Sequence, residues 1–194
     1  MKDIEIEIKV KVSDSAGLRK FLAEQAEFRG EQHQIDEYFN PPHKDFLADE
    51  PVAEWLRLRT TDSKQSINYK QWHAGDDGVT NHCDEYETTV EDASKVRKIF
   101  AALGFKPLVT VDKLRKNWRY QNYEVSMDSV KNLGDFVEIE YVGGAVDLDP
   151  KQITDEMVEW LCGLGCGQVE RDFRGYPYWL LFGNKPRAEA RDGR

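Results

Sequence analysis

The sequence has few residues that could build a disulfide scaffold or a zinc site. Its 194 residues include only three cysteines, Cys83, Cys162 and Cys166, and four histidines. An odd number of cysteines is typical of reduced thiols, and no zinc ligand set of familiar spacing is present. An apolar run of about 18 residues is also absent, and the first residues lack the apolar core of a signal peptide. We therefore expect a cytoplasmic protein without a membrane span.

The chain also lacks an excess of basic residues. It carries 27 Lys and Arg against 36 Asp and Glu, a formal net charge of −9, and its pI is near 5.0. This balance argues against a protein that binds duplex nucleic acid through bulk charge. The length suits one domain, since no repeat or linker divides the chain. We expect that domain to cover residues 1–182, and the charged tail 183–194, which has no apolar anchors, to be disordered.

Residues 4–12 alternate strictly between apolar and charged side chains, a pattern typical of a strand. Seven further strands, mostly joined by short turns, are predicted at 31–39, 53–61, 65–72, 83–90, 108–120, 123–130 and 135–143. Capping residues and helical spacing predict helices at 13–25, 91–104, 150–165 and 176–183. Hairpin connections imply an antiparallel sheet, and a sheet of this size often closes into a barrel. The predicted fold class is α+β, mainly β: an eight-stranded antiparallel β-barrel with flanking helices.

Nearly every predicted strand has one charged face, and the charges cluster by sign, as in the stretches RLR, KLR, EIE and DEYE. An open sheet with a solvated face explains each strand taken alone, but such a face usually mixes Ser, Thr, Gln and Lys. The clusters favour charged faces that line a polar tunnel, where each charge needs a partner or a ligand. Carboxylates suit hard cations such as magnesium, and arginine and lysine suit phosphate.

The stretch EIEIK at 5–9 resembles the Glu-x-Glu-x-Lys signature of the CYTH superfamily, also called triphosphate tunnel metalloenzymes. Further stretches follow in the family's order: IDEYF at 35–39, LRLR at 56–59, YK at 69–70, DEYE at 84–87, DKLR at 112–115 and LGDFVEIE at 133–140. The resemblance covers roughly residues 1–182. It implies an eight-stranded barrel whose interior is a tunnel for a triphosphate and a divalent metal, Mg²⁺ or Mn²⁺.

Carried over position by position, the resemblance implies a role for each tunnel residue. The implied metal ligands are Glu5, Glu7, Asp128, Glu138 and Glu140. The implied triphosphate-binding residues are Lys9, Lys11, Arg57, Arg59, Lys70, Lys113 and Arg115. Glu5, Glu7 and Lys9 are the implied catalytic residues, and the implied supporting residues are Asp36, Tyr38, Glu85 and Glu87.

The fold does not decide the reaction. The resemblance implies either a triphosphatase, acting on inorganic triphosphate, thiamine triphosphate or ATP, or a class IV adenylyl cyclase. The triphosphatase is favoured because no His-Phe pair precedes Glu5, and because residues 138–140 keep two glutamates, a fuller set that suits two metals and a water nucleophile. A non-catalytic sensor of polyphosphate or nucleotide is the third interpretation.

Two further features of the sequence stay open. Trp55 and Trp72 could pack in the core or stack on a base. An exposed edge or helix could support a homodimer.

Overall fold

The computed structural model describes residues 4–74, 80–144 and 149–183, and within this part the side chains of residues 4, 5, 74 and 80–82 are not described. The described strands are β1 (Ile4–Val12), β2 (Glu27–Asn40), β3 (Glu54–Thr61), β4 (Gln65–Ala74), β5 (Thr80–Thr89), β6 (Lys106–Tyr120), β7 (Tyr123–Val130), β8 (Gly134–Tyr141) and β9 (Val169–Arg171). The helices are α1 (Ala16–Gln25), α2 (Ala93–Ala102), α3 (Pro150–Gly163) and α4 (Gly175–Phe182). The tail that was expected to be disordered lies outside the described residues, apart from Gly183.

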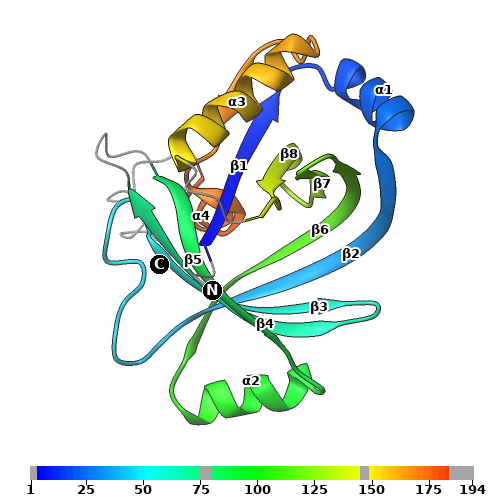
Figure 1. Cartoon of the computed structure of the whole chain (residues 1–194). Coiled ribbons are helices and arrows are strands. Elements are labelled where there is room, and N and C mark those ends of the chain that lie inside the picture. The colour runs from blue at the N-terminus through cyan, green and yellow to red at the C-terminus, as the bar shows by residue number, and fades with distance from the viewer. Residues whose placement is uncertain (1–3, 75–79, 145–148, 184–194) are drawn as a thin grey trace.

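All strands belong to one antiparallel sheet in the order β5-β4-β3-β2-β6-β7-β8-β1-β9. The start of β1 also pairs with β5, through Ile4 with Asp84 and Glu5 with Cys83, which brings the two sides of the sheet together. The other end of β1 pairs with β9 instead. The result is a barrel-like tunnel that is not closed along its whole length (Figure 1). The predicted fold class is confirmed. The short strand β9, Val169–Arg171, was not predicted from the sequence.

The outer faces of the strands carry the apolar residues, and helices cover them. One core cluster joins β1, β7 and β8 to α1 and α3, with Ile8, Val125 and Ile139 on the strands facing Leu22 and Met157. Because side chains alternate along a strand, the same packing that buries these residues turns the charged residues between them into the tunnel. The outer core therefore fixes which side chains reach the interior.

The two other helices pack elsewhere on the barrel. Helix α2 begins after Asp92, whose side chain accepts a hydrogen bond from the Lys95 amide, and it packs Phe100 on the outside against Phe39 and Leu58. Helix α4 places Tyr176, Tyr178 and Phe182 in a cluster with residues of β2, β3, β6, β7 and β8. None of the described helices is long and apolar enough to cross a membrane.

Candidate active site

The inward faces of the strands enclose a cavity of about 410 Å³. Its walls come from β1 to β8, and the segment 171–177 contributes the remaining part. Six of the predicted phosphate-binding residues line it together: Lys9, Arg57, Arg59, Lys70, Lys113 and Arg115. The strand alternation read from the sequence therefore brings these cations into one space.

Asp36 holds two of the arginines in place. Its carboxylate accepts hydrogen bonds of 2.6 and 2.7 Å from Nε and Nη2 of Arg59, and Nη1 of Arg57 lies 3.8 Å away. Burial disfavours the charged form of Asp36, but the Arg57 and Arg59 guanidiniums hold the pKa of this carboxyl well below its usual range. Asp36 is thus a charged partner of two cations, and its implied supporting role in the site stays a prediction.

Asp128 has a similar position, which differs from the metal-ligand role implied for it. Its side chain is only 2% exposed, and the two oxygens accept hydrogen bonds from Nε and Nη2 of Arg115 at 2.6 Å each. Lys113 Nζ and the hydroxyl of Tyr176 also donate to it, both at 2.8 Å. Four donors occupy the carboxylate, and Asp128 does not line the cavity. The structure therefore brings Asp128 to the cations, and Nη2 of Arg115 contacts both Asp128 and Glu138, another implied metal ligand.

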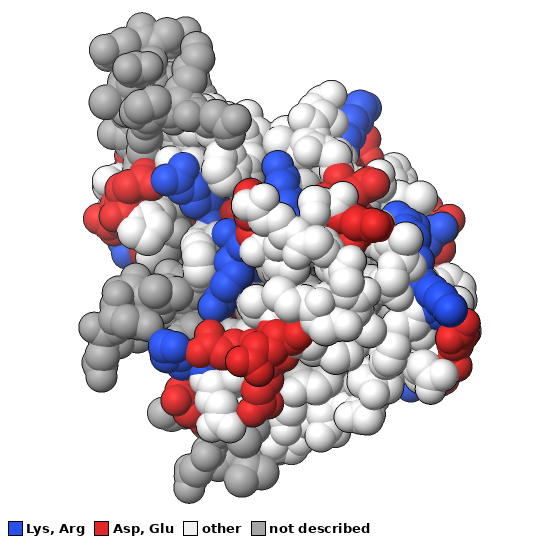
Figure 2. All heavy atoms as spheres, turned by 90° about the horizontal axis from the view of Figure 1, so that it is seen from above, with Lys and Arg blue, Asp and Glu red and all other residues white. Residues whose placement is uncertain are grey.

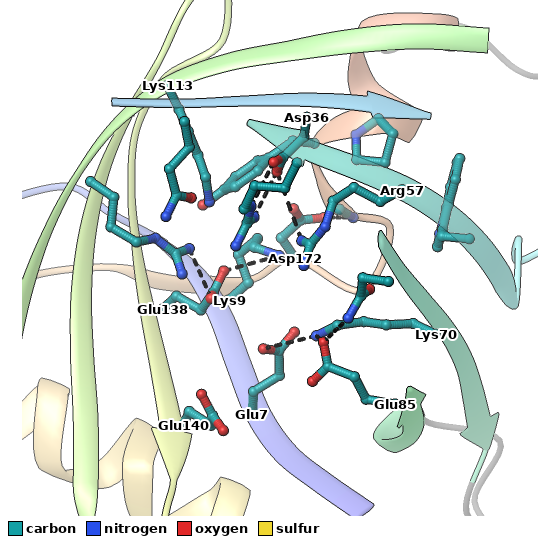
Figure 3. Close-up of a pocket in the computed structure, with 18 of the residues that line it drawn as sticks. Glu7, Lys9, Asp36, Arg57, Lys70, Glu85, Lys113, Glu138, Glu140 and Asp172 are labelled. Carbon is teal, nitrogen blue, oxygen red and sulfur yellow. Dashed lines mark hydrogen bonds and ion pairs between the residues drawn. The ribbon is translucent and has the colours of Figure 1, made fainter. Parts of the chain in front are cut away.

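Glu138 does line the cavity and lies between two cations. Its oxygens are 3.3 Å from Lys9 Nζ and 2.8 Å from Nη2 of Arg115. Burial opposes the ammonium form of Lys9, yet the nearby carboxylates of Glu138 and Glu7 raise its pKa above the ordinary value. Glu138 and Lys9 are therefore held as an ion pair inside the tunnel (Figure 3).

Glutamates from three neighbouring strands form a row on the inner wall. Glu7 on β1 is the register partner of Glu140 on β8, which is also the partner of Glu124 on β7. All three line the cavity, and Glu7 is only 7% exposed. Like charges on directly opposed residues destabilise a sheet, so a cation at this row would relieve repulsion. We call Glu7, Glu124 and Glu140 the acidic row.

The acidic row lies away from most of the basic residues of the cavity, and Lys70 is the exception. Figure 3 shows Glu7, Glu85 and Glu140 together, away from Lys113 and Arg57. Lys70 lies between the carboxylates of Glu7 and Glu85, at 3.7 Å from each. The cavity is therefore electrically divided, with room for a cation at one side and for phosphate at the other.

The donor set fits a magnesium-type ion that shares its ligands with a substrate. Among the described residues, no three Asp, Glu, His or Cys side chains converge into a complete metal site. Magnesium, however, usually takes one or two carboxylates and completes its octahedron with water and substrate phosphates. The neighbouring glutamates Glu7 and Glu140 meet that requirement. The side chain of Glu5 is outside the described part of the chain, so its implied role stays a prediction.

The remaining predicted residues differ in their relation to the cavity. Tyr38 and Glu85 line it, and Glu85 accepts a hydrogen bond from the amide of Asn68. Glu87 lines it too, but its carboxylate pairs with Lys64 at 2.6 Å. Lys11 does not reach the cavity: its side chain is exposed and its Nζ lies over the Phe136 ring, 4.9 Å from the ring centre.

Phe136 and Tyr176 explain the position of Lys11. Their rings pack at 4.8 Å between centroids and fill the space beyond Lys9 along β1. The alternation of β1 gives Lys11 the same parity as Lys9, but only packing against a helix far along the chain decides where the tunnel ends. Lys11 is therefore not brought together with the other phosphate-binding candidates.

Sequence reasoning missed the contribution of the segment 171–177. Tyr176 donates to Asp128, and the ammonium groups of Lys9 and Lys113 lie 4.5 and 5.1 Å from the centre of its ring. The backbone amide of Asp172 donates to the carbonyl of Lys9 at 2.7 Å. The segment has no strand alternation, so the sequence offered no signal that it faces the tunnel. Glu124 was also missed, although it shares the parity of Asp128 on β7.

Lys113, which lies among the cations of the cavity, has an unusual protonation equilibrium. Burial and the neighbouring Arg115 guanidinium lower the pKa of Lys113 from 10.5 to about 7, against the opposing effect of Asp128. Arg115 stays charged, because its carboxylate neighbours outweigh its burial and raise its pKa well above the ordinary value. The positive charge of this wall therefore varies with pH at Lys113.

Comparison with known proteins identifies a family and several relatives. The model of the CYTH domain family matches residues 3–176. A Methanocaldococcus jannaschii protein, provisionally named an adenylate cyclase, is 34% identical over 163 residues, which is 83% of this chain and 89% of that protein. A structure of a Pyrococcus horikoshii protein is similar, with a TM-score of 0.74 and 25% identity over 91% of this chain and 98% of the other.

A Hippeastrum protein shares the fold with a TM-score of 0.58 and 18% identity, over 98% of this chain and 96% of that chain. It is provisionally named an adenylyl cyclase, and its structure is described as revealing a dominant triphosphatase activity.

Proposed function

Since the chain belongs to the CYTH domain family, we propose that it is a divalent-metal-dependent triphosphatase that binds its substrate inside the tunnel. The observation that carries the proposal is the division of one cavity into an acidic row and a facing set of lysines and arginines. Such a pair of surfaces matches a triphosphate and the divalent cation that accompanies it.

Four cations, which we call the cationic wall, would bind and orient the phosphates: Arg57, Arg59, Lys113 and Arg115. Arg59 and Arg115 are each held by two hydrogen bonds to a buried carboxylate, so they need little rearrangement when the substrate arrives. Donors fixed in advance stabilise the charge that develops during phosphoryl transfer better than donors that must reorganise. Lys9, between the two sides of the cavity, would contact the phosphate nearest the acidic row.

Glu7 and Glu140 would hold the divalent cation at the acidic row. When bound there, such an ion neutralises phosphate charge and supplies a water of lowered pKa as the nucleophile. Because the acidic row lies at one side of the cavity, we propose that the terminal phosphoryl group points toward Glu7 and Glu140. The remaining phosphates would then lie along Arg57, Arg59, Lys113 and Arg115.

A class IV adenylyl cyclase is the alternative, favoured by one finding: the Methanocaldococcus jannaschii relative carries an adenylate cyclase name at 34% identity. In a cyclase, the ribose 3′-hydroxyl attacks the α-phosphorus and pyrophosphate leaves. The triphosphate would then lie in the tunnel with its α-phosphorus at the acidic row. The two functions use the same residues and differ in the direction of the substrate.

Product analysis separates these functions. The protein is incubated with Mg²⁺ or Mn²⁺ and, separately, with inorganic triphosphate, thiamine triphosphate and ATP, and products are followed by phosphorus NMR and ion-exchange chromatography. We expect orthophosphate from at least one substrate and little cyclic AMP. Glu140→Gln serves as the variant expected to lose most of the activity at the same metal concentration, and Lys20→Gln, on the exposed side of α1, as a control.

Formation of cyclic AMP with an equal amount of pyrophosphate would show that the protein is an adenylyl cyclase and not a triphosphatase. Binding of a triphosphate without any product would instead favour a sensor, which keeps the tunnel as a binding site and removes the chemistry. Absence of both binding and products would overturn the proposed function altogether.

A further inference from the structure

One wall of the cavity is made of uncharged amides. Gln32 and Gln34 on β2 and Asn117 on β6 line the cavity, and we call them the amide wall. The register places Gln34 opposite Lys113 and Gln32 opposite Arg115, so the amide wall continues directly from the phosphate-binding cations. A group attached to a phosphate on these cations would therefore lie within reach of the amides.

One buried acceptor of the amide wall has no hydrogen-bond partner among the described residues. Gln34 Nε2 donates to Gln32 Oε1 at 2.8 Å, and Asn117 Oδ1 accepts from Ser126 Oγ at 2.8 Å. Within the described residues, Gln34 Oε1 has no hydrogen-bond partner, although the residue is only 4% exposed. Buried side-chain oxygens in folded proteins almost always have a partner, so this atom points to a donor supplied from outside the chain.

A phosphate group does not supply that donor. Ionised phosphate oxygens are acceptors, and the cations of the neighbouring wall satisfy them. Hydroxyl and amino groups do supply donors, and the amides can accept and donate together as such a group requires. The chemistry of the amide wall therefore fits the organic part of a substrate better than its phosphates.

We propose that the amide wall binds the organic group of an organic triphosphate, with Gln34 Oε1 accepting a hydrogen bond from its hydroxyl or amino group. The proposal rests on the proposed function for the position of the phosphates and adds the class of substrate. The cavity volume of about 410 Å³ lies in the range typical of pockets for small organic ligands. Gln34 is thus the residue that would distinguish an organic triphosphate from inorganic triphosphate.

The test compares substrates in a Gln34→Met variant, which keeps the length of the side chain and removes both polar atoms. The values of kcat/KM are measured for ATP, thiamine triphosphate and inorganic triphosphate. We expect a loss of about tenfold for whichever organic substrate the protein prefers, the scale of one hydrogen bond to a buried group. The value for inorganic triphosphate should change by less than about twofold. Gln71→Met, exposed on β4, is the matched control.

A second variant separates the lost hydrogen bond from a general disturbance of the site. Gln34→Glu keeps an acceptor oxygen and adds a negative charge beside the cations. It should lower kcat/KM for every triphosphate by a similar factor. The ratio of kcat/KM for the organic substrate to that for inorganic triphosphate should therefore stay the same, whereas Gln34→Met lowers it. The arm with ATP and the arm with thiamine triphosphate show which organic group is recognised.

An equal loss for all three substrates in Gln34→Met would overturn the inference and leave the proposed function intact. If the protein turns over none of them, the proposed function fails, and the same ratios are measured as dissociation constants by calorimetry with Mg²⁺ present. Equal effects on those constants in Gln34→Met would overturn the inference in that case too.

Discussion

The guanidinium of Arg115 holds the carboxylate of Asp128 through two hydrogen bonds of 2.6 Å each. Lys113 and Tyr176 donate to the same carboxylate, so one buried acid organises two cations and anchors the start of α4. Asp36 does the same for Arg59 on the neighbouring strand. The cationic wall is therefore assembled by carboxylates that lie behind it, before any phosphate binds.

Replacement of Asp128 tests this arrangement. Asp128→Asn leaves Lys113 and Arg115 buried with one less counter-charge, and loss of one partner of a buried ion pair typically costs about 3–5 kcal/mol. We expect a lower free energy of unfolding in denaturant titrations and a higher KM. The metal concentration for half-maximal activity should stay unchanged. A strong rise in that concentration would show that Asp128 is a metal ligand after all.

Replacement of the acidic row should change the metal dependence instead. Glu7→Gln and Glu140→Gln remove a proposed metal ligand, so we expect the metal concentration for half-maximal activity to rise at least about tenfold. For Glu7→Gln, the metal-free melting temperature should fall as well, because the change breaks the contact of a buried carboxylate with Lys70. Glu170→Gln, exposed on β9, is the control. A variant with normal metal dependence would place the metal elsewhere.

Ligand binding should stabilise the whole barrel. A triphosphate adds contacts to the cations of the cavity, and a metal ion adds contacts to the glutamates, and the unfolded chain offers neither site. At a ligand concentration ~100 times the dissociation constant, stability should rise by about 2.7 kcal/mol, readable as an increase in melting temperature. Metal with triphosphate should give a larger shift than either alone. No shift with any triphosphate would contradict the binding site itself.

The sequence predicted the elements of the site well because strand alternation is a local property. Once EIEIK and EIE were placed on strands, their parity decided that Glu7, Lys9 and Glu138 face inward, and packing of the intervening apolar residues under helices enforces it. The same parity contained Glu124, which was left without a role. The order of the strands in the sheet was not predicted, because strand pairing cannot be deduced from local signals.

What the sequence could not provide depends on contacts between distant segments. Asp128 shares the parity of a cavity residue, but its oxygens are occupied by donors from β6 and α4. Lys11 has the right parity as well, yet Phe136 and Tyr176 end the tunnel before it. Neither fact follows from alternation, because the first depends on the pairing of β6 with β7 and both depend on where α4 docks. The cytoplasmic location stays a prediction, and the homodimer stays one option that the sequence left open.

The last prediction concerns pH and follows from Lys113. Its pKa of about 7 means that the free protein carries an ammonium group there below pH 7 and a neutral amine well above it. A bound triphosphate favours the charged form and so raises this pKa. Above pH 7, binding must therefore take up a proton, and the affinity for triphosphate should fall as pH rises. The fall approaches about tenfold in the dissociation constant per pH unit when one proton is taken up.

Calorimetry in buffers of different ionisation enthalpy counts that proton directly. At pH 8, where the terminal phosphate is already largely ionised, we expect uptake close to one proton per triphosphate bound by the wild type. Lys113→Met has no ammonium at any pH, so it should bind more weakly, with little proton uptake and a flat dependence above pH 7. Lys116→Met, whose side chain pairs with Glu31 on the outside of the barrel, should behave as the wild type. Equal proton uptake by wild type and Lys113→Met would show that another group titrates on binding and that Lys113 keeps one protonation state throughout.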